Sequence, residues 1–352
     1  MNKKTESNGK ARKTMLTLLC IFLGLVLVMM LAATIYMERL LGLINRVDPD
    51  NTQVTLSSSE AQEYLENNRD EVDPDYSGPT MNAGDVTWAP DVTNPVEQGE
   101  NIVNILLIGQ DRREGEKRSR SDAMILCTVN KKEKTLTMTS IMRDLYVQIP
   151  GYSDDRINVC YVFGGMKLLN DCIEKNFGVT VDGNVEVDFA GFETVIDLVG
   201  GVDIELTGSE AQHLNGKNNS WTLVKGVNHL NGEQALAYAR IRSVTVKEVG
   251  DFGRTSRQRT VLMKLVEQAK TMSLTQLNNL LTQVLPTLTT DLTDAEIFEY
   301  AMEMFPLLAD LKIETGRIPA DGAYFQTMID GKSVLVPDLE KNRQIFRDIL
   351  AD

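Results

Sequence analysis

The stretch NIVNILLIGQD, residues 101–111, decides the fold of this chain. Its apolar run is nearly continuous up to Gly109, which is typical of a strand buried on both faces of a sheet. Asp111 follows this strand almost at once, and functional side chains gather at strand ends in sheets that helices cover. We therefore predict a buried strand that presents a carboxylate at one edge of a central sheet.

The residues after this strand alternate between strand-like and helix-like patterns. AMILCTVN (123–130) and TLTMTSIM (135–142), separated by KKEK, predict an antiparallel hairpin with a charged turn. Apolar residues at helical spacing predict helices at 159–176, 189–198, 231–239, 253–272, 274–284, 293–307 and 338–350. Short strands are expected at 202–206, 311–318 and 333–336. Without a Rossmann-type glycine fingerprint, this order predicts an α/β fold whose mixed, largely antiparallel central sheet has helices on both faces.

The composition and the N-terminal segment indicate a membrane-anchored protein. The 352 residues are 42% hydrophobic and carry a formal net charge of −14, which indicates a folded chain and argues against nucleic acid as a partner. Residues 15–37 are uncharged and mainly apolar, long enough at about 1.5 Å per residue to cross a hydrocarbon core about 30 Å thick. The basic residues that precede them are Lys3, Lys4, Lys10, Arg12 and Lys13.

This charge pattern sets the expected topology. Under the positive-inside rule, residues 1–14 form a cytoplasmic tail and residues 15–37 a single transmembrane helix in contact with membrane lipid. The remainder then lies outside the cell membrane. A cleaved signal peptide is the alternative, although the apolar run exceeds a normal signal-peptide core.

An acidic segment is expected to separate the membrane from the folded domain. Residues 48–100 contain thirteen acidic side chains and one basic side chain, so we interpret residues 38–100 as a solvated extracellular stem. Its one helical candidate, Ser58 to Asn68, is polar on most faces and is not expected to pack tightly. The folded catalytic domain is expected to span residues 101–352.

Missing motifs exclude several reaction classes. The sequence contains no HExxH, Walker loop, GxGxxG or GxSxG, and its only histidines are His213 and His229, which disfavours a serine or cysteine hydrolase. Outside the predicted span stand Cys127, Cys160 and Cys172, an odd number without a C-x-x-C pair, which argues against a disulfide scaffold or a zinc site. Cys127 is expected to be a buried small apolar residue. A Cys160–Cys172 bridge is left open.

Two aspartates indicate a metal ion at the sheet edge. Asp111 follows the first strand, and Asp122 enters the next one. If the two strands are neighbours, both carboxylates emerge at one edge, where they repel unless a cation joins them. Hard oxygen ligands of this kind suit Mg²⁺, with Mn²⁺ as the alternative ion. The competing interpretation is that Asp111 caps a turn and Asp122 pairs with a local arginine.

The strongest signal is a group of arginines in YARIR (238–242) and DFGRTSRQ (251–258). Arg240 and Arg242 alternate on an extended chain and so share a side. Arg254, Arg257 and Gln258 stand at helical spacing on the first turn of a helix, whose free amides and dipole attract anions. Four converging guanidinium groups repel one another unless a polyanion lies between them, and arginine forks suit pyrophosphate. A surface lattice of salt bridges is the competing interpretation.

Other arginines are weaker candidates for the same site. Arg143 follows the predicted hairpin, and Arg156 follows a Pro-Gly turn; each alone is a weak signal. Four further arginines are expected to be ordinary solvated surface residues: Arg112, Arg113, Arg118 and Arg259.

Seven segments in order resemble the LytR-CpsA-Psr family of cell-wall glycopolymer ligases over about residues 102–350: NILLIGQD, RSDAMIL, SIMRDLYVQIPG, RINVCY, LNGEQALAYARIR, DFGRTSRQR and SVLVPDLEKNRQ. Met142 departs from the family, which usually has proline there. The resemblance implies that Asp111 and Asp122 are associated with Mg²⁺. The pyrophosphate-binding residues that it implies are Arg143, Arg240, Arg242, Arg254 and Gln258 and, by a looser match, Arg120, Arg156 and Arg257.

The resemblance also implies an activity. Members of the family are understood to move an anionic glycopolymer, such as teichoic acid or capsular polysaccharide, from a polyprenyl pyrophosphate carrier to peptidoglycan. We expect in-line phosphoryl transfer, with Asp111 as general base and Arg143 as a further catalytic residue. The polyprenyl tail is expected in an apolar tunnel, for which the helices at 159–176 and 293–307 are candidates. The alternatives are a pyrophosphatase acting on the same carrier and a non-enzymatic envelope regulator.

Overall fold

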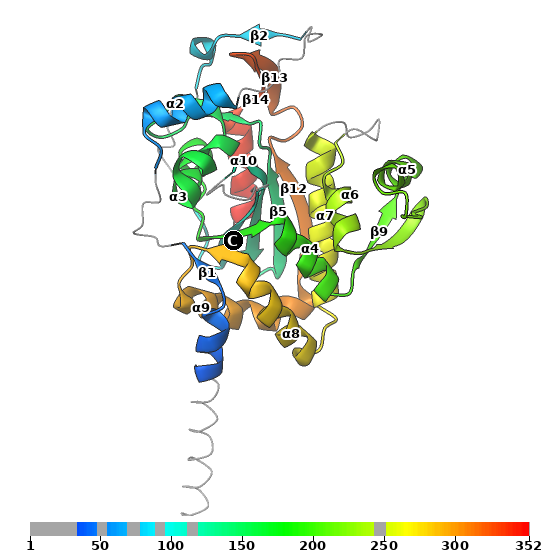
Figure 1. Cartoon of the computed structure of the whole chain (residues 1–352). Coiled ribbons are helices and arrows are strands. Elements are labelled where there is room, and N and C mark those ends of the chain that lie inside the picture. The colour runs from blue at the N-terminus through cyan, green and yellow to red at the C-terminus, as the bar shows by residue number, and fades with distance from the viewer. Residues whose placement is uncertain are drawn as a thin grey trace, which may run out of the picture. The chain divides into compact units, whose positions relative to one another are not determined.

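The structure is a computed structural model, which describes residues 34–47, 55–68, 78–88, 96–110, 119–242 and 251–351 (Figure 1). The chain divides into two compact units, residues 1–44 and 45–352. Residues 34–41 of the first unit are helical, and most of the predicted span at 15–37 lies outside the described residues. Within the described ranges, no helix has the length and apolar character needed to cross a membrane.

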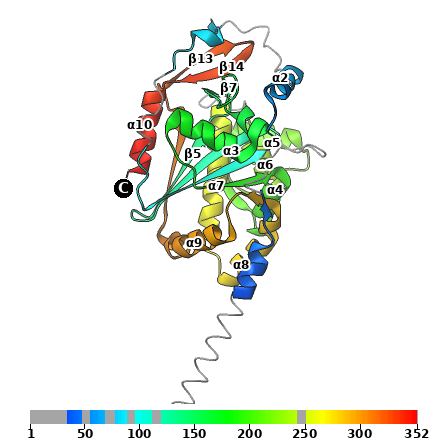
Figure 2. The same cartoon turned by 90° about the vertical axis from the view of Figure 1, so that its left-hand side faces the viewer.

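A mixed sheet forms the centre of the second unit (Figure 2). Its described strands, in spatial order, are β1 (Asn45–Arg46), β11 (Leu288–Thr290), β8 (Gly183–Asp188), β3 (Ile102–Gln110), β4 (Ser121–Asn130), β5 (Thr135–Ile141) and β12 (Lys312–Ile318). The antiparallel pairs β3–β4 and β4–β5 confirm the predicted hairpin and its neighbour. Because β1–β11, β3–β8 and β5–β12 are parallel, the sheet is mixed as predicted but not largely antiparallel.

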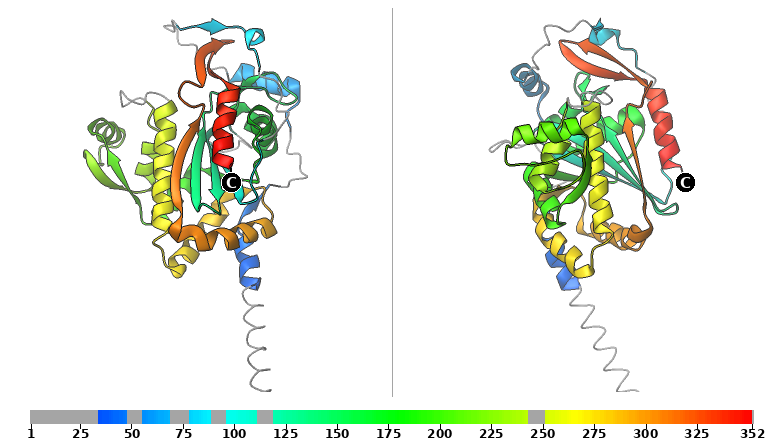
Figure 3. Two further views of the ribbon diagram at one scale, coloured as in Figure 1. Left: turned by 180° about the vertical axis from the view of Figure 1, so that it is seen from behind. Right: turned by 90° about the vertical axis from the view of Figure 1, so that its right-hand side faces the viewer.

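Helices cover both faces of this sheet, because successive side chains of a strand point to opposite sides. Leu106 of β3 packs with α3 (Asn158–Phe177) and α10 (Leu339–Leu350), whereas Leu107 packs with α7 (Asp251–Ala269). Figure 3 shows α7 in yellow and α10 in red on opposite sides of the strands. The helices predicted over these ranges are thereby confirmed.

A small lobe with its own core follows β8. It comprises α4 (Phe189–Leu198), β9 (Val202–Leu206), α5 (Gly208–Lys217), β10 (Gly226–Leu230) and α6 (Gly232–Ala239). Asn231 caps α6 and Gln234 completes the capping box, as the sequence pattern indicates. Ile204, Leu214 and Leu230 are fully buried here. This lobe positions α4 and α6 over the sheet face that α7 also covers.

The remaining elements close the two ends of the domain. At one end lie α8 (Leu274–Val284), the 3₁₀-helix η2 (Leu285–Thr287), α9 (Asp294–Met304) and the 3₁₀-helix η3 (Phe305–Asp310). The helix predicted at 293–307 is α-helical only to Met304, since Pro306 has no amide hydrogen to continue it. At the other end lie β2 (Thr80–Met81), η1 (Ala83–Asp85), β6 (Tyr146–Val147), β7 (Asp155–Arg156), β13 (Tyr324–Ile329) and β14 (Lys332–Pro337).

The interpretation of residues 38–100 as a solvated stem is wrong for the described parts of that segment. α2 (Ser58–Asn67) forms where the helix was predicted, yet its Ala61 is only 3% exposed and belongs to the main core. The Tyr64 ring meets the edge of Phe163 at 6.3 Å between centroids. A few apolar side chains therefore attach this polar helix to the core. The high acidic content of the whole segment gives no indication of these contacts.

The rest of the acidic segment also joins the domain. β2 pairs in parallel with β13, and the Trp88 indole stacks on Tyr146 at 5.9 Å and donates to Asp154. The folded unit therefore begins before Asn101, the boundary that we predicted. Burial of these aromatic rings contributes to the stability of the folded domain.

The three cysteines of the described residues contact the hydrophobic cores. Cys127 packs between the sheet and α7, and burial raises the pKa of its thiol to about 12. Cys160 and Cys172 are buried free thiols on α3, whose backbone kinks at Gly164 and Gly165 and brings the two sulfur atoms to 2.7 Å.

Candidate functional site

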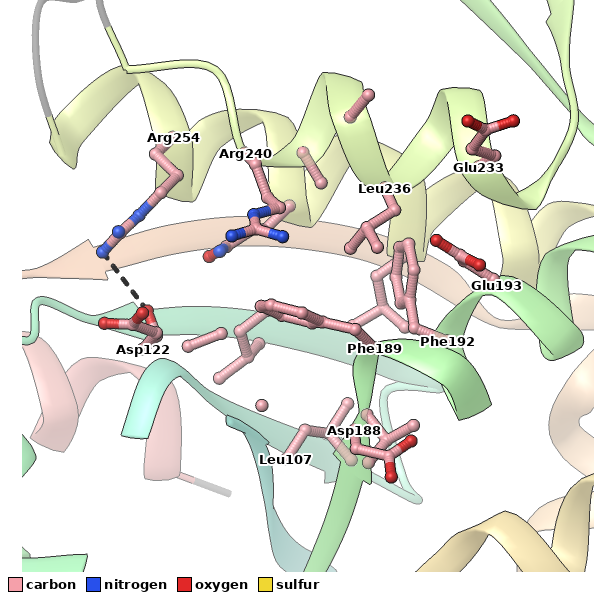
Figure 4. Close-up of a pocket in the computed structure, with 18 of the residues that line it drawn as sticks. Leu107, Asp122, Asp188, Phe189, Phe192, Glu193, Glu233, Leu236, Arg240 and Arg254 are labelled. Carbon is pink, nitrogen blue, oxygen red and sulfur yellow. Dashed lines mark hydrogen bonds between the residues drawn. The ribbon is translucent and has the colours of Figure 1, made fainter. Parts of the chain in front are cut away.

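A cavity of about 690 Å³ lies between the central sheet and helices α4, α6 and α7 (Figure 4). One part of its wall is apolar, with Leu107, Ile125, Phe192, Leu236 and Leu262 among the lining residues. Another part is polar and contains Asp122, Arg240, Arg242, Arg254 and Gln258. Figure 4 shows Arg240, Arg254 and Asp122 together at one end, while Glu193 and Glu233 lie at the other end.

The β3–β4 hairpin brings Asp122 to this cavity. Gln110, the last residue of β3, pairs with Ser121, the first residue of β4, after a bulge at Gly109. The two strand ends therefore meet at one edge, as predicted from their order in the sequence. Asp111 itself lies outside the described residues, so its position relative to Asp122 is not part of the structure.

Arginine and aspartate side chains alternate along the polar end. Arg143 follows β5 and donates from Nη1 to Asp122 Oδ1 at 2.8 Å and from Nε to Asp251 Oδ2 at 2.7 Å. Arg254, from the first turn of α7, donates from Nη2 to the same Asp251 oxygen at 2.8 Å. Asp251 thus holds two guanidinium groups side by side, which would otherwise repel each other at this distance. Sequence reasoning missed this role of Asp251.

Burial and charge set the protonation of these groups. Burial opposes ionisation of Asp122, but Arg143, with Arg254 and Arg242 near it, holds the pKa of that carboxyl below its usual value. Burial, aided by the adjacent Asp251 carboxylate, raises the pKa of Asp144. Arg156 lies behind the site, where its Nη1 donates to Asp144 Oδ1 at 3.4 Å. Asp122 is therefore a carboxylate anion surrounded by arginine side chains.

Two buried polar atoms on the cavity wall have no hydrogen-bond partner. They are Nε of Arg254, whose side chain is 5% exposed, and Oε1 of Gln258. Leaving a buried polar group unsatisfied costs about 1–3 kcal/mol, more for a charged group, so such atoms indicate a site that a ligand completes. Burial lowers the pKa of Arg254, and the neighbouring Arg143 lowers it further, so an anion would relieve both effects.

Arg240 and Arg242 complete the cationic end. α6 ends at Ala239, and Arg240 caps it in a helical rather than the predicted extended conformation, yet Arg240 and Arg242 both line the cavity. The Arg240 guanidinium lies over the Phe189 ring, 4.5 Å from its centroid. This cation–π contact orients a side chain that is otherwise exposed.

Four predicted pyrophosphate ligands are not among the residues that line the cavity: Arg120, Arg143, Arg156 and Arg257. Arg257 donates from Nε to Glu210 at 2.7 Å and from Nη1 to the Ile241 carbonyl at 3.2 Å, because a buried carboxylate on α5 competes for it. Arg257 therefore braces α7 and the Arg242 segment. Arg120 donates to the Asn68 carbonyl at 2.8 Å and belongs to the α2 side of the domain.

Other expectations are corrected in the same way. Arg259, expected to be solvated, is half-buried and donates to Ser140 Oγ at 2.7 Å, whereas Arg112, Arg113 and Arg118 lie outside the described residues. Neither α3 nor α9 contributes to the cavity wall, although both were candidates to line a tail-binding tunnel. α3 packs on the opposite face of the sheet, and its apolar residues form the core.

The described side chains supply only part of a metal-binding site. Among the described side chains, no group of three or more His, Cys, Asp or Glu residues is arranged to hold a metal ion. Asp122 is ionised and 28% exposed, and its Oδ1 accepts from Arg143, so it suits one ligand position rather than a complete site. The second predicted ligand, Asp111, lies outside the described residues.

The cavity joins a cationic end to an apolar chamber. Its arginine end suits a phosphate or pyrophosphate group, and its Leu and Phe side chains suit a hydrocarbon chain. The fold and the site thus define an α/β protein with a pocket for an amphiphile that has an anionic head.

Comparison with known proteins agrees with this class. The model of the LytR_cpsA_psr family matches residues 53–349, and the chain belongs to this family. The matched range begins within the acidic segment, in agreement with the packing of α2 on the domain.

Named relatives and solved structures are similar over most of the chain. The polyisoprenyl-teichoic acid–peptidoglycan teichoic acid transferase TagU of Bacillus cereus is 36% identical over 222 residues, which are 62% of this chain and 69% of that protein. The regulatory protein MsrR of Staphylococcus aureus is 31% identical, covering 72% of this chain and 76% of its own.

Solved structures of TagT resemble this fold. The complex named TagT bound to LIIa-WTA has a TM-score of 0.58 and 28% identity, covering 73% of this chain and 92% of that one. TagT with bound octaprenyl pyrophosphate lipid has a TM-score of 0.56 and 26% identity, and the match covers 74% of this chain and 95% of that one.

Proposed function

We propose that this protein transfers an anionic glycopolymer from a polyprenyl pyrophosphate carrier to peptidoglycan. The observation that carries the proposal is the cavity in which Arg240, Arg242 and Arg254 stand at one end of an apolar chamber. The name of TagU and the lipid bound to TagT support the same reaction.

Each end of the cavity has a proposed task. Arg240, Arg242, Arg254 and Gln258 bind the pyrophosphate, and the unpartnered atoms of Arg254 and Gln258 gain partners when it enters. Leu107, Ile125, Phe192 and Leu262 surround the first part of the polyprenyl tail. Arg143 acts beside them by holding Asp122 and Asp251 in place.

The proposed chemistry is in-line phosphoryl transfer. A hydroxyl oxygen of peptidoglycan forms a bond to the phosphorus that carries the glycan, and the bond from that phosphorus to the bridging oxygen breaks. The electron pair leaves with polyprenyl phosphate, and the hydroxyl proton passes to a base, for which we propose Asp111. The arginines stabilise charge that builds on the phosphoryl oxygens and on the leaving group.

A divalent cation is also proposed. Asp122, kept ionised by its lowered pKa, and Asp111 would hold Mg²⁺, with Mn²⁺ as an alternative, together with oxygens of the pyrophosphate. The ion would supply additional positive charge at the diphosphate.

We propose the membrane topology on the sequence pattern. Residues 1–14 lie in the cytoplasm, residues 15–37 cross the cell membrane once, and the domain faces outward, where peptidoglycan is found. A membrane-resident carrier is consistent with such an anchor.

The proposal is tested by transfer of labelled polymer. The full chain receives a carrier whose glycan is radiolabelled, together with insoluble peptidoglycan, and label on the insoluble fraction is measured. We expect the double variant Arg240→Ala/Arg242→Ala to reduce attachment by at least about a hundredfold, about 2.7 kcal/mol, because two of the phosphate forks are gone. The matched control Arg347→Ala, on the exposed face of α10, is expected to retain activity. Release of soluble glycan phosphate without attachment would instead assign a pyrophosphatase.

A further inference from the structure

One end of the domain carries an apolar surface that no other described element covers. Among the described residues of the unit 45–352, eight large apolar side chains are exposed, and five of them lie on α8, α9 and η3. We call this set the apolar rim: Leu274, Leu281, Phe298, Met302 and Phe305. Figures 1 and 2 show α8 and α9 at the same end of the domain, opposite β13 and β14.

The sequence of α9 divides its surface into three faces. At about 100° per residue, Ile297, Tyr300 and Met304 form the inner face, which is partly buried against the domain. Phe298, Met302 and Phe305 form a second face and are 45%, 61% and 52% exposed. The acidic residues occupy a third face: Glu296, Glu299 and Glu303. An apolar stripe at helical spacing that is separate from the packing face indicates a second contact partner.

α8 adds a second stripe of the same kind. Leu274 and Leu281 stand seven residues apart, on one side of the helix, and are 72% and 38% exposed. α8 contains no charged residue, and Val284 is its one buried residue. Its polar residues are all uncharged, so this helix can lie against lipid without bringing a charge into an apolar environment.

The chain enters the domain beside this surface. Asn45 donates from Nδ2 to the Pro286 carbonyl at 2.8 Å, immediately after α8, and Arg46 donates to the Leu292 carbonyl and pairs with Asp294, the first residue of α9. Seven residues lie between Met37, the end of the predicted transmembrane helix, and Asn45, and a fully extended chain over this stretch spans at most about 28 Å. The ends of α8 and α9 are therefore held within that reach of the lipid bilayer.

We infer that the apolar rim is a membrane contact, in which Phe298, Met302 and Leu274 enter the interface of the bilayer that the transmembrane helix crosses. The inference rests on the proposed membrane anchor and adds a second attachment. The acidic face of α9 does not attract anionic lipids, so the contact depends on burial of apolar side chains and forms on neutral phosphatidylcholine as well. It would hold the cavity at the surface from which a lipid carrier must be taken.

Spin labels on the full chain test this contact. The chain is reconstituted in phosphatidylcholine vesicles with Cys20→Ser, and a nitroxide is attached at Phe298→Cys or Met302→Cys. The remaining thiols are buried or weakly acidic and react little. Val227→Cys, 70% exposed on β10, is the matched control. Power saturation compares collisions of each label with oxygen, which partitions into lipid, and with a water-soluble nickel complex.

We expect oxygen to dominate at positions 298 and 302 and nickel to dominate at position 227. Equal nickel access at all three positions would overturn the contact. Dipolar broadening between labels that disappears on dilution in lipid would also overturn it, because the rim would then bind a second copy. All three sites are exposed, so the variants should unfold thermally like the parent chain, which calorimetry checks.

A second variant separates the inference from the proposed function. Phe298→Lys/Met302→Lys should reduce transfer from a vesicle-embedded carrier several-fold, while transfer from a short carrier in detergent stays unchanged. Unchanged transfer from vesicles would contradict the membrane contact and leave the transferase proposal standing. Loss of transfer in both assays would instead indicate that the rim has another role.

Discussion

The arginines in and around the polar end of the cavity are held by different kinds of partner. Arg254 is placed by Asp251, Arg240 by the Phe189 ring, and Arg257 by Glu210, which withdraws it from the cavity. Sequence spacing alone put Arg254 and Arg257 on a shared face. The buried acid on α5 decides between them, and its approach to α7 depends on the packing of the small lobe.

For polymer attachment, the planar guanidinium of Arg254 is expected to be more important than its positive charge alone. Arg254→Lys keeps the positive charge but lacks the planar guanidinium, whose separate nitrogens can donate to Asp251 and to a phosphate oxygen in a fixed geometry. We expect polymer attachment to fall by at least about tenfold, about 1.4 kcal/mol. Radiolabel transfer measures this, with Lys264→Arg on the exposed side of the same helix as control. Full activity of the lysine variant would show that charge alone suffices.

The lowered pKa of Asp122 predicts a pH dependence of stability. A carboxyl whose pKa is depressed in the folded state contributes stability above its unfolded pKa, about 3.9, and loses it as the pH falls through the folded value. Asp122→Asn should therefore be less stable than the parent at pH 7, and the difference should shrink below about pH 4. Chemical unfolding in detergent at both pH values measures it. A difference that grows in acid would contradict the assignment of Arg143 as its partner.

At the scale of elements, local patterns placed the main helices and strands well. The buried run of β3, the hairpin of β4 and β5, and the capping box of α6 depend on neighbouring residues, so they follow from the sequence. β8, β10 and α5 were not predicted, because their mixed polar and apolar residues form no clear period. The acidic segment was misjudged because α2 docks through only a few side chains.

Docking of α2 can be measured by paired substitutions. Ala61 is 3% exposed, so Ala61→Arg should destabilise the protein by about 1–3 kcal/mol through overpacking. Gln62→Arg, one residue away on the exposed side of the helix, should have little effect. Thermal unfolding compares the two. Equal, small effects would restore the interpretation of this segment as a solvated stem.

At the scale of the whole molecule, the cavity requires parts that are distant in the chain. The sheet supplies Asp122 and Ile125, the small lobe supplies Phe189 and Arg240, and α7 supplies Arg254. A ligand that binds all of these stabilises the folded state, by about 2.7 kcal/mol at a hundred times its dissociation constant.

This stabilisation gives a test that does not depend on turnover. Polyprenyl pyrophosphate should raise the thermal unfolding temperature of the full chain in detergent, and polyprenyl monophosphate should raise it less, because one phosphate engages fewer arginines. Arg240→Ala/Arg242→Ala should lose most of the shift. An equal shift in that variant would mean that the lipid binds elsewhere.

The sequence by itself determined the strands β3, β4 and β5, the principal helices, the family and most of the charged residues at the polar end of the cavity, but not the central strand β8. These features depend on periodicity and on short motifs, which act over a few neighbouring residues. Only the tertiary structure decided that Arg257 and Arg120 turn away, that Asp251 joins Arg143 to Arg254, and that α2 belongs to the domain. Those outcomes depend on contacts between side chains that are far apart in the sequence, and such contacts form only when the chain has folded.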